Sequence, residues 1–368
     1  MCLLACYSLT GKAVAYVSII RPLYIGEVLL ICGIGVTLLY NKGLFNIFRI
    51  FPSKLLLIFM LWGALCTFHY ISTYGVNSLR DAAIWGYGLY AFVISGLLVN
   101  KVEYLPQIIK YYKWFIPRFL LLLPVCVIIN ARQIPFVIVL LRQGEIGVQL
   151  SGVLSFIMSG LIKKNLLWLY IAFLEAITIL TYNRGAVLTV LSVITLFIFM
   201  RPFKNKLWRR LISVISILFL IIILLSPIYN IFPERRLSRM KSIFITGEAS
   251  DEGTKSWRIS WWQKIIDDTV YGDYFWMGQG YGINLADKYG YQVDNKHSLR
   301  SPHNGHLTIL ARSGVTGFIL WIYLQLTWVW NIVKYYKLCR KNGQTVWENL
   351  FLFLLAFWLA FMVNTNFD

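Results

Sequence analysis

Two short polar motifs carry the side chains of this chain that are best suited to chemistry. Ser301-Pro302-His303-Asn304 stands immediately before a long apolar run, so His303 is expected near a helix start. The dipole at a helix start favours a neutral imidazole that can accept a proton, which suits a general base. Tyr182-Asn183-Arg184-Gly185 joins two apolar runs, and a guanidinium at such a junction suits a phosphate oxygen. The plainer alternatives are a structural histidine and an arginine that caps the preceding helix.

Apolar runs long enough to cross a bilayer recur along the chain around these motifs. The composition is 58% hydrophobic and 14% charged with a mean hydropathy of +0.65, whereas soluble domains are about 45–50% apolar and about 25% charged. A membrane-spanning helix needs about 20 residues. The opening lacks a basic region, so we expect its apolar segment to be a retained helix. We therefore predict an all-α polytopic membrane protein with about eleven transmembrane helices, over roughly residues 2–20, 22–41, 54–72, 82–99, 113–130, 146–162, 166–182, 186–200, 209–228, 306–333 and 346–366.

Basic residues are distributed unevenly between the connections of these runs. Alternate connections hold seventeen Lys or Arg residues, whereas the opposite short connections hold only five arginines, Arg21, Arg80, Arg132, Arg142 and Arg184. The positive-inside rule places the first set in the cytoplasm and the other connections outside. The net charge of +19 therefore reflects membrane topology, and we expect no nucleic-acid partner. The five outer arginines could also serve as headgroup anchors.

One long polar segment interrupts the apolar runs and organises the chain. We expect transmembrane helices in residues 1–228, an extracytoplasmic loop carrying part of the active site in residues 229–304, and the last two transmembrane helices in residues 305–368. Within the loop, apolar residues at helical spacing predict an amphipathic helix over residues 255–270. Gly278, Gly280 and Gly282 follow it and predict a tight turn.

Candidate metal ligands are sparse in this sequence. His303 and His306 could share a helix face, but a catalytic zinc site usually has three protein ligands, and no third is marked. The acidic pair Asp267-Asp268 lies on the predicted amphipathic helix, where a solvated face explains it. The six cysteines lie in apolar runs or at a cytoplasmic end and imply no disulfide framework. We expect no metal and no other cofactor.

Three motifs together resemble the O-antigen ligase and O-antigen polymerase superfamily of bacterial envelope glycosyltransferases. Their order and spacing agree with the family over about residues 180–335. The chain departs from the family at Asn183, where serine is more usual, and it ends at Asp368, where relatives generally carry another helix. The motifs are Tyr182-Asn183-Arg184-Gly185-Ala186, then Ser256-Trp257-Arg258 through Trp262 followed by Gly278-Gln279-Gly280-Tyr281-Gly282, and finally His303-Asn304 with Leu307, Gly314 and Gly317.

The resemblance implies a GT-C-like fold and a specific reaction. A glycan would pass from a polyprenyl-pyrophosphate donor to an acceptor hydroxyl outside the bacterial inner membrane, without metal and with inversion at the anomeric carbon. Arg184 and Arg258 would hold the donor pyrophosphate, and His303 would orient or deprotonate the acceptor hydroxyl. Membrane lipid and a chain-length regulator are further expected partners. We also expect four residues to contribute to substrate binding: Arg142, Asn304, Gly280 and Trp262.

Several functions stay open at this point. A polymerase would use a second lipid-linked glycan as acceptor, whereas a ligase would use lipid A core or another hydroxyl; we lean slightly towards the polymerase. A transporter or flippase of lipid-linked saccharides would instead line its path with the same arginines and use the intramembrane carboxylates Glu27 and Glu175. A non-catalytic subunit that assembles other envelope enzymes is the third possibility.

Overall fold

A computed structural model describes most of the 368-residue chain. The described residues are 18–20, 23–40, 47–100, 102–131, 143–162, 166–180, 184–201, 249–292, 295, 297 and 299–366. They divide into two compact units. The first comprises Met1–Leu141, Trp257–Gln344 and Asp368, and the second comprises Arg142–Ser256 and Thr345–Phe367. Each unit is described by itself below.

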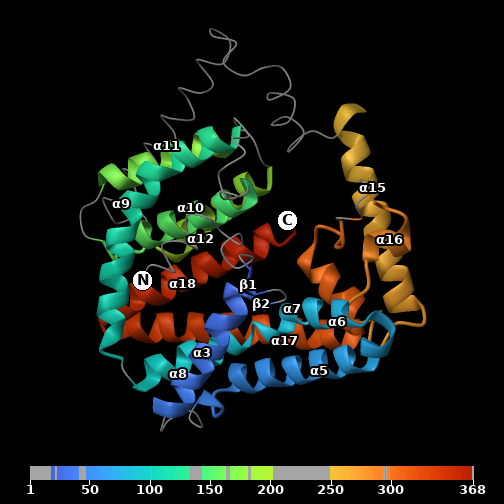
Figure 1. The fold of residues 1–368 in the computed structure, drawn as a ribbon. Coiled ribbons are helices and arrows are strands. Elements are labelled where there is room, and N and C mark those ends of the chain that lie inside the picture. Colours follow the sequence, from blue (N-terminus) through green and yellow to red (C-terminus); the bar gives the residue numbers. More distant parts are fainter. Residues whose placement is uncertain are drawn as a thin grey trace. The chain divides into compact units, whose positions relative to one another are not determined.

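The first unit contains two of the three predicted catalytic residues, Arg258 and His303, and Figure 1 labels most of its elements. Its helix α15 begins in the second unit and enters the first at Trp257. The elements are β1 Ser18–Ile20, β2 Leu23–Tyr24, α3 Ile25–Tyr40, α5 Phe51–Tyr74, α6 Val76–Asp81, α7 Ala83–Gly86, α8 Leu89–Asn100, α9 Tyr104–Ala131, α15 Ala249–Ile266, the π-helical turn η1 Asp267–Tyr271, α16 Leu285–Tyr289 and α17 Gly305–Lys341.

Two expected spans differ from the observed elements. The helix expected over residues 2–20 is wrong at its end, because β1 pairs antiparallel with β2, Ser18 opposite Tyr24. The span expected over residues 82–99 starts earlier and is interrupted by short turns, giving α6, α7 and α8. The span expected over residues 209–228 lies outside the described residues.

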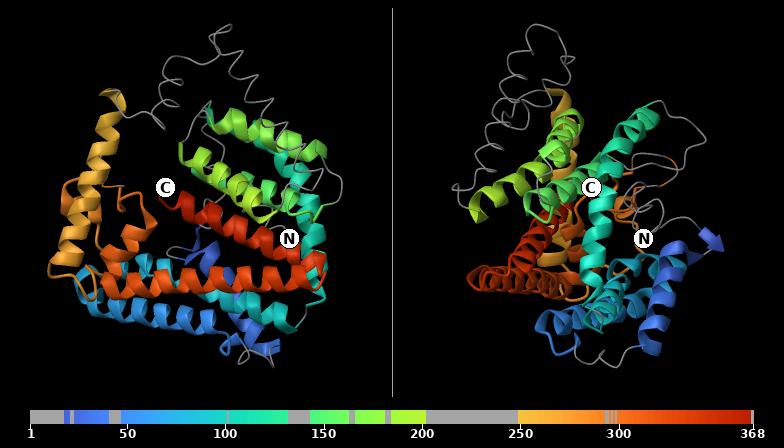
Figure 2. Two further views of the ribbon diagram at one scale, coloured as in Figure 1. Left: turned by 180° about the vertical axis from the view of Figure 1, so that it is seen from behind. Right: turned by 90° about the vertical axis from the view of Figure 1, so that its left-hand side faces the viewer.

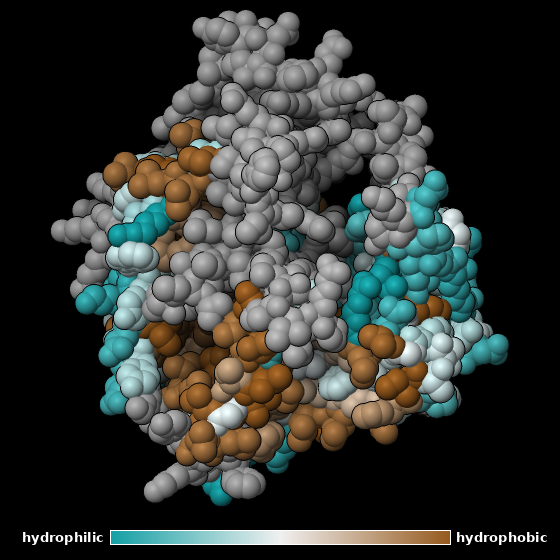
Figure 3. All heavy atoms as spheres, viewed as in Figure 1, coloured by the Kyte–Doolittle hydropathy of each residue, from teal (hydrophilic) through white to brown (hydrophobic). Residues whose placement is uncertain are grey.

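Helices long and apolar enough to cross a membrane confirm the prediction of a membrane protein. Among the described residues these are Phe51–Tyr74, Val76–Val99, Gly305–Lys341 and Thr345–Asn364, and four further apolar helices are shorter. Along α5 the side chains of Ile58, Leu61, Leu65 and Phe68 are exposed, as expected for a face in contact with lipid. In Figure 3 hydrophobic residues cover much of the surface around α3, whereas α15 and α16 are mainly hydrophilic. The number of about eleven spans and the GT-C-like architecture stay predictions.

Helix α17 runs alongside α5 in the first unit (Figure 2), and it is broken at Gly314. That glycine has φ 68° and ψ −174°, a backbone conformation that is essentially restricted to glycine. Groups freed by the break are bonded elsewhere: Val315 N donates to Phe275 O at 2.7 Å, and Ser313 O accepts from Trp62 Nε1 at 2.9 Å. The segment around residues 275–279 is thereby attached to α17, since non-helical backbone within an apolar helix needs partners inside the protein.

We expect Gly314→Ala to destabilise the folded protein by at least about 2 kcal/mol. A Cβ there would lie 2.4 Å from Trp276 O in a backbone conformation that alanine avoids. Gly35→Ala on α3 is the matched control, because a Cβ at that position has no atom within 4 Å and alanine favours helices. Thermal unfolding in detergent measures both. Equal midpoints for the two variants would contradict the role assigned to the break.

The second unit contains α10 Gln143–Met158, α11 Leu166–Leu180, α12 Arg184–Met200 and α18 Thr345–Asn364. Small residues let its helices approach closely: a Cβ on Gly147 would lie 2.6 Å from Ala186 Cβ, and one on Gly152 would lie 2.7 Å from the Phe357 ring. Such small-residue contacts are typical of helix packing in membranes. At the end of α12, Arg201 donates to Ser159 O and to Asn349 Oδ1. These bonds connect α10, α12 and α18.

Candidate functional site

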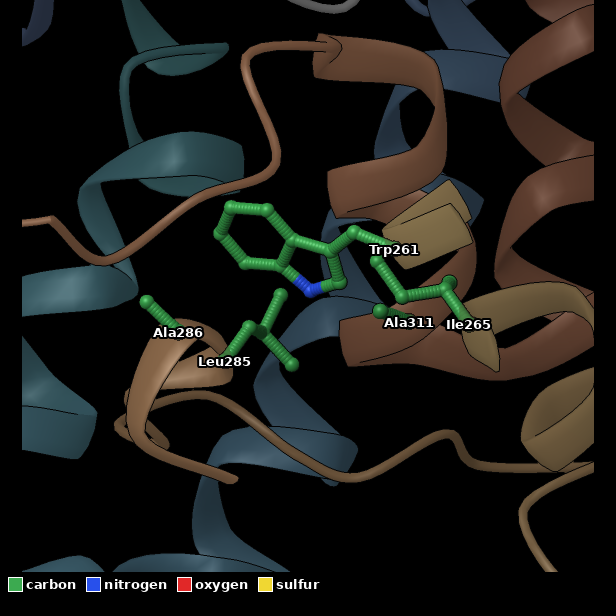
Figure 4. Packing of buried hydrophobic residues seen from close by; sticks show 5 residues of the cluster. All are labelled: Trp261, Ile265, Leu285, Ala286 and Ala311. Carbon is green, nitrogen blue, oxygen red and sulfur yellow. The ribbon is translucent and has the colours of Figure 1, made fainter. Parts of the chain in front are cut away.

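Helix α15 is fixed by its apolar stripe. Trp261 and Ile265 are completely buried and form one cluster with Leu285, Ala286 and Ala311. Figure 4 shows the Trp261 indole between these side chains from α15, α16 and α17. Burial of a large aromatic side chain is worth several kcal/mol. The amphipathic helix predicted over residues 255–270 is confirmed in kind, with α15 ending at Ile266 and η1 continuing to Tyr271.

His303 lies in a strained connection just before α17. Its φ is 52°, in the left-handed region that residues other than glycine seldom adopt. Both flanking residues are held: Trp262 Nε1 donates to Pro302 O at 2.8 Å, and Asn304 Oδ1 accepts from His306 N and Leu307 N at 3.0 and 3.1 Å. Asn304 is therefore the N-cap of α17. A residue other than glycine keeps a left-handed backbone conformation only where the surrounding structure enforces it. Such residues cluster in active sites.

Arg258 and His303 both lie near the ring of Trp257 on α15. The Arg258 Cζ is 5.8 Å from the Trp257 ring centroid, and the His303 ring centroid is 6.4 Å from it in an edge-on arrangement. The structure thus brings together Arg258 and His303, which are predicted from separate motifs. Trp262 and Asn304 join them through their bonds to the His303 segment.

One nitrogen of the Arg258 guanidinium group is left without a hydrogen bond by the described residues. This nitrogen, Nε, is buried. Burial lowers the pKa of the Arg258 guanidinium from its ordinary value, although an arginine stays charged at neutral pH. A partly desolvated guanidinium is favourably placed to bind an anionic group of a ligand.

The other predicted site residues lie elsewhere. Gly280 has φ 84°, and a Cβ there would lie 2.2 Å from the Tyr70 ring, so this glycine permits close packing of the turn against α5. Arg184 is the first residue of α12 in the second unit, and its side chain lies outside the described residues, as does the whole of Arg142. The catalytic role of Arg184 and the substrate-binding roles of Arg142 and Gly280 stay predictions.

The acidic pair and the histidines have protein partners. Asp268 Oδ2 accepts from Tyr289 OH at 2.9 Å and lies 3.4 Å from Lys288 Nζ. His306 Nδ1 accepts from Trp321 Nε1 at 3.1 Å. Among the residues whose side chains the structure describes, no group of three or more His, Cys, Asp or Glu residues could hold a metal ion. Metal independence stays a prediction.

Sequence reasoning missed three charged residues beside this site. Asp81 of α6 pairs with Arg300 at 3.1 Å and with Arg312 at 2.6 Å. Arg312 carried a usable signal, because a charge inside an otherwise apolar helix is a functional suspect. Asp81 carried none, since a carboxylate at the edge of an apolar run is ordinary.

Together, the apolar helices and the polar segment with Arg258 and His303 define a polytopic membrane protein with a candidate anion-binding site outside its spans. Residues 166–322 match the family model described as O-antigen ligase. This match supports the resemblance to the O-antigen ligase and polymerase superfamily that the motifs predicted. The match contains Arg184, Arg258 and His303. No curated protein matches the chain significantly.

Proposed function

We propose that this protein is a glycosyltransferase that moves a glycan from a polyprenyl-pyrophosphate donor to an acceptor hydroxyl outside the bacterial inner membrane. The family match and the membrane helices support a membrane protein that ligates or polymerises glycans. The observation that carries the proposal is the pairing of the strained His303 with the half-buried Arg258 around the Trp257 ring. A base and a cation at one place are what transfer from a pyrophosphate requires.

The proposed reaction needs two functions from the protein. The acceptor hydroxyl attacks the anomeric carbon of the donor sugar, and its proton passes to the His303 imidazole. The bond between that carbon and the pyrophosphate oxygen breaks, and the polyprenyl pyrophosphate leaves with the electron pair. Arg258, with Arg184 as the second predicted cation, offsets the negative charge that builds on the leaving group. Direct attack of this kind inverts the anomeric centre.

Analysis of lipid-linked intermediates in a deletion strain tests the proposal. We expect single lipid-linked repeats to accumulate and the wild-type gene to restore long chains, which is the polymerase outcome. Accumulation of long lipid-linked chains would instead identify a ligase. Repeats trapped on the cytoplasmic face would indicate a flippase, and an unchanged profile would indicate a non-catalytic subunit. The last two outcomes contradict the proposed transfer.

A further inference from the structure

The Asp81 side chain is hydrogen-bonded to three segments of the first unit that are far from it in the sequence. Its carboxylate oxygen Oδ2 accepts hydrogen bonds from Arg312 Nη1 at 2.6 Å, from Arg300 Nη2 at 3.1 Å and from Gly282 N at 3.1 Å. These donors come from α17, from the segment before His303 and from the glycine turn. The carboxylate stands on α6, outside the part of the chain that matches the family.

The environment makes these bonds strong. The side chains of Asp81 and Arg312 are only 9% and 3% exposed, and that of Arg300 is 19% exposed. Hydrogen bonds between ionised groups are stronger than neutral ones, and low exposure limits screening by water. Because Arg80 Nε also lies 3.8 Å from Asp81 Oδ1, a single carboxylate serves several guanidinium groups. Loss of its charge would leave Arg312 buried without a counter-ion among the described residues.

Arg300 links Asp81 to the segment that contains His303. Its Nη2 donates both to Asp81 Oδ2 and to Gly282 O, the latter at 2.8 Å. The segment from residue 300 to residue 304 is therefore held at its start by Arg300, at Pro302 by Trp262 and at its end by the Asn304 cap. The left-handed φ of His303 lies between these fixed points.

We propose that Asp81 is a positioning residue: through Arg300 it fixes the backbone that aims the His303 side chain. The catalytic consequence rests on the proposed function, whereas the mechanical consequence does not. In this view a helix from the N-terminal half of the chain positions a site whose two described catalytic candidates, Arg258 and His303, lie in the C-terminal half.

Hydrogen–deuterium exchange of the peptide covering residues 299–304 tests the mechanical part. We expect at least about tenfold faster exchange in Asp81→Asn and in Arg300→Ala, with α18 unchanged. Arg300→Ala leaves the pair between Asp81 and Arg312 in place, so it carries the test if Asp81→Asn does not fold. Asp267→Asn is the matched control: Asp267 is an exposed aspartate of η1, and its Oδ1 accepts from Gln263 Nε2 at 2.9 Å. Exchange at the wild-type rate in both test variants would overturn the proposal.

Kinetics with lipid-linked saccharide extracted from the deletion strain test the catalytic part. In Asp81→Asn and in Arg300→Ala we expect kcat to fall by about tenfold or more, with KM within about twofold of wild type. The reason is that a misplaced His303 slows the chemical step. The double variant Asp81→Asn/Arg300→Ala should be no slower than Asp81→Asn alone, since both substitutions break the same ion pair between Asp81 and Arg300. Faster exchange with an unchanged kcat overturns the positioning role. Wild-type transfer by His303→Ala would refute the proposed function instead, and the exchange result would still decide whether Asp81 fixes the segment.

Discussion

His303→Ala is expected to reduce glycan transfer by about 10²–10⁴-fold, the range typical for loss of a general acid or base. His303 is the only residue of the described site that combines a titratable ring with a left-handed backbone next to a helix start. Without the imidazole, the acceptor hydroxyl has no group to take its proton. Single-turnover transfer in proteoliposomes with lipid-linked saccharide measures the loss.

Two matched variants separate the chemistry of His303 from its backbone. His303→Gly should be at least as stable as His303→Ala, because glycine adopts φ 52° without strain, but it should be equally inactive. His306→Ala removes a histidine three residues later whose ring accepts a bond from Trp321, and it should keep most of the activity. Retained transfer by His303→Gly would refute the assigned role.

Arg258→Ala is expected to lower the rate of glycan transfer by about 10²–10³-fold. This is the range typical for removing a group that stabilises charge in a transition state. The cause is loss of the cation that offsets negative charge on the departing pyrophosphate. Arg258→Lys should recover only part of the rate, because an ammonium cannot bind phosphate oxygens through a planar fork. Arg184→Ala should have a comparable effect if both arginines hold the same pyrophosphate.

Stability distinguishes this role of Arg258 from a structural one. Its Nε has no partner among the described residues, so Arg258→Ala should leave the unfolding midpoint in detergent nearly unchanged. Lys264→Ala on the same helix is the control, because Lys264 is an exposed cation whose Nζ lies 4.9 Å from the Tyr291 ring centroid. A large drop in midpoint for Arg258→Ala, with transfer lost in proportion, would assign the arginine to the fold.

The sequence predicted the elements around the site well, for local reasons. Trp257, Trp261 and Ile265 repeat at helical spacing, so the helix and its buried face follow from period alone. The asparagine after His303 precedes an apolar run, and it caps α17 as such residues commonly do. Apolar runs predicted the helix bounds less well where short turns interrupt the helix, as between α6, α7 and α8.

The break in α17 could not be predicted from the hydrophobic pattern of the sequence. The apolar run continues through Gly314, and a single glycine inside a helix usually costs only about 1 kcal/mol. The helix breaks because Phe275 O and Trp62 Nε1 supply the bonds that the freed backbone needs. Both partners come from remote segments, which no local pattern can reveal.

The sequence by itself determined that this is a membrane protein and which family's motifs it carries, and it predicted candidate site residues in one polar segment. Those features depend on composition and short-range spacing. Tertiary structure alone decided that Arg258 and His303 share the Trp257 ring and that Asp81 bonds Arg300 and Arg312. The reason is physical: hydrogen bonds and ion pairs depend on distances between atoms, and residues more than two hundred positions apart come within 3 Å only when the helices have packed.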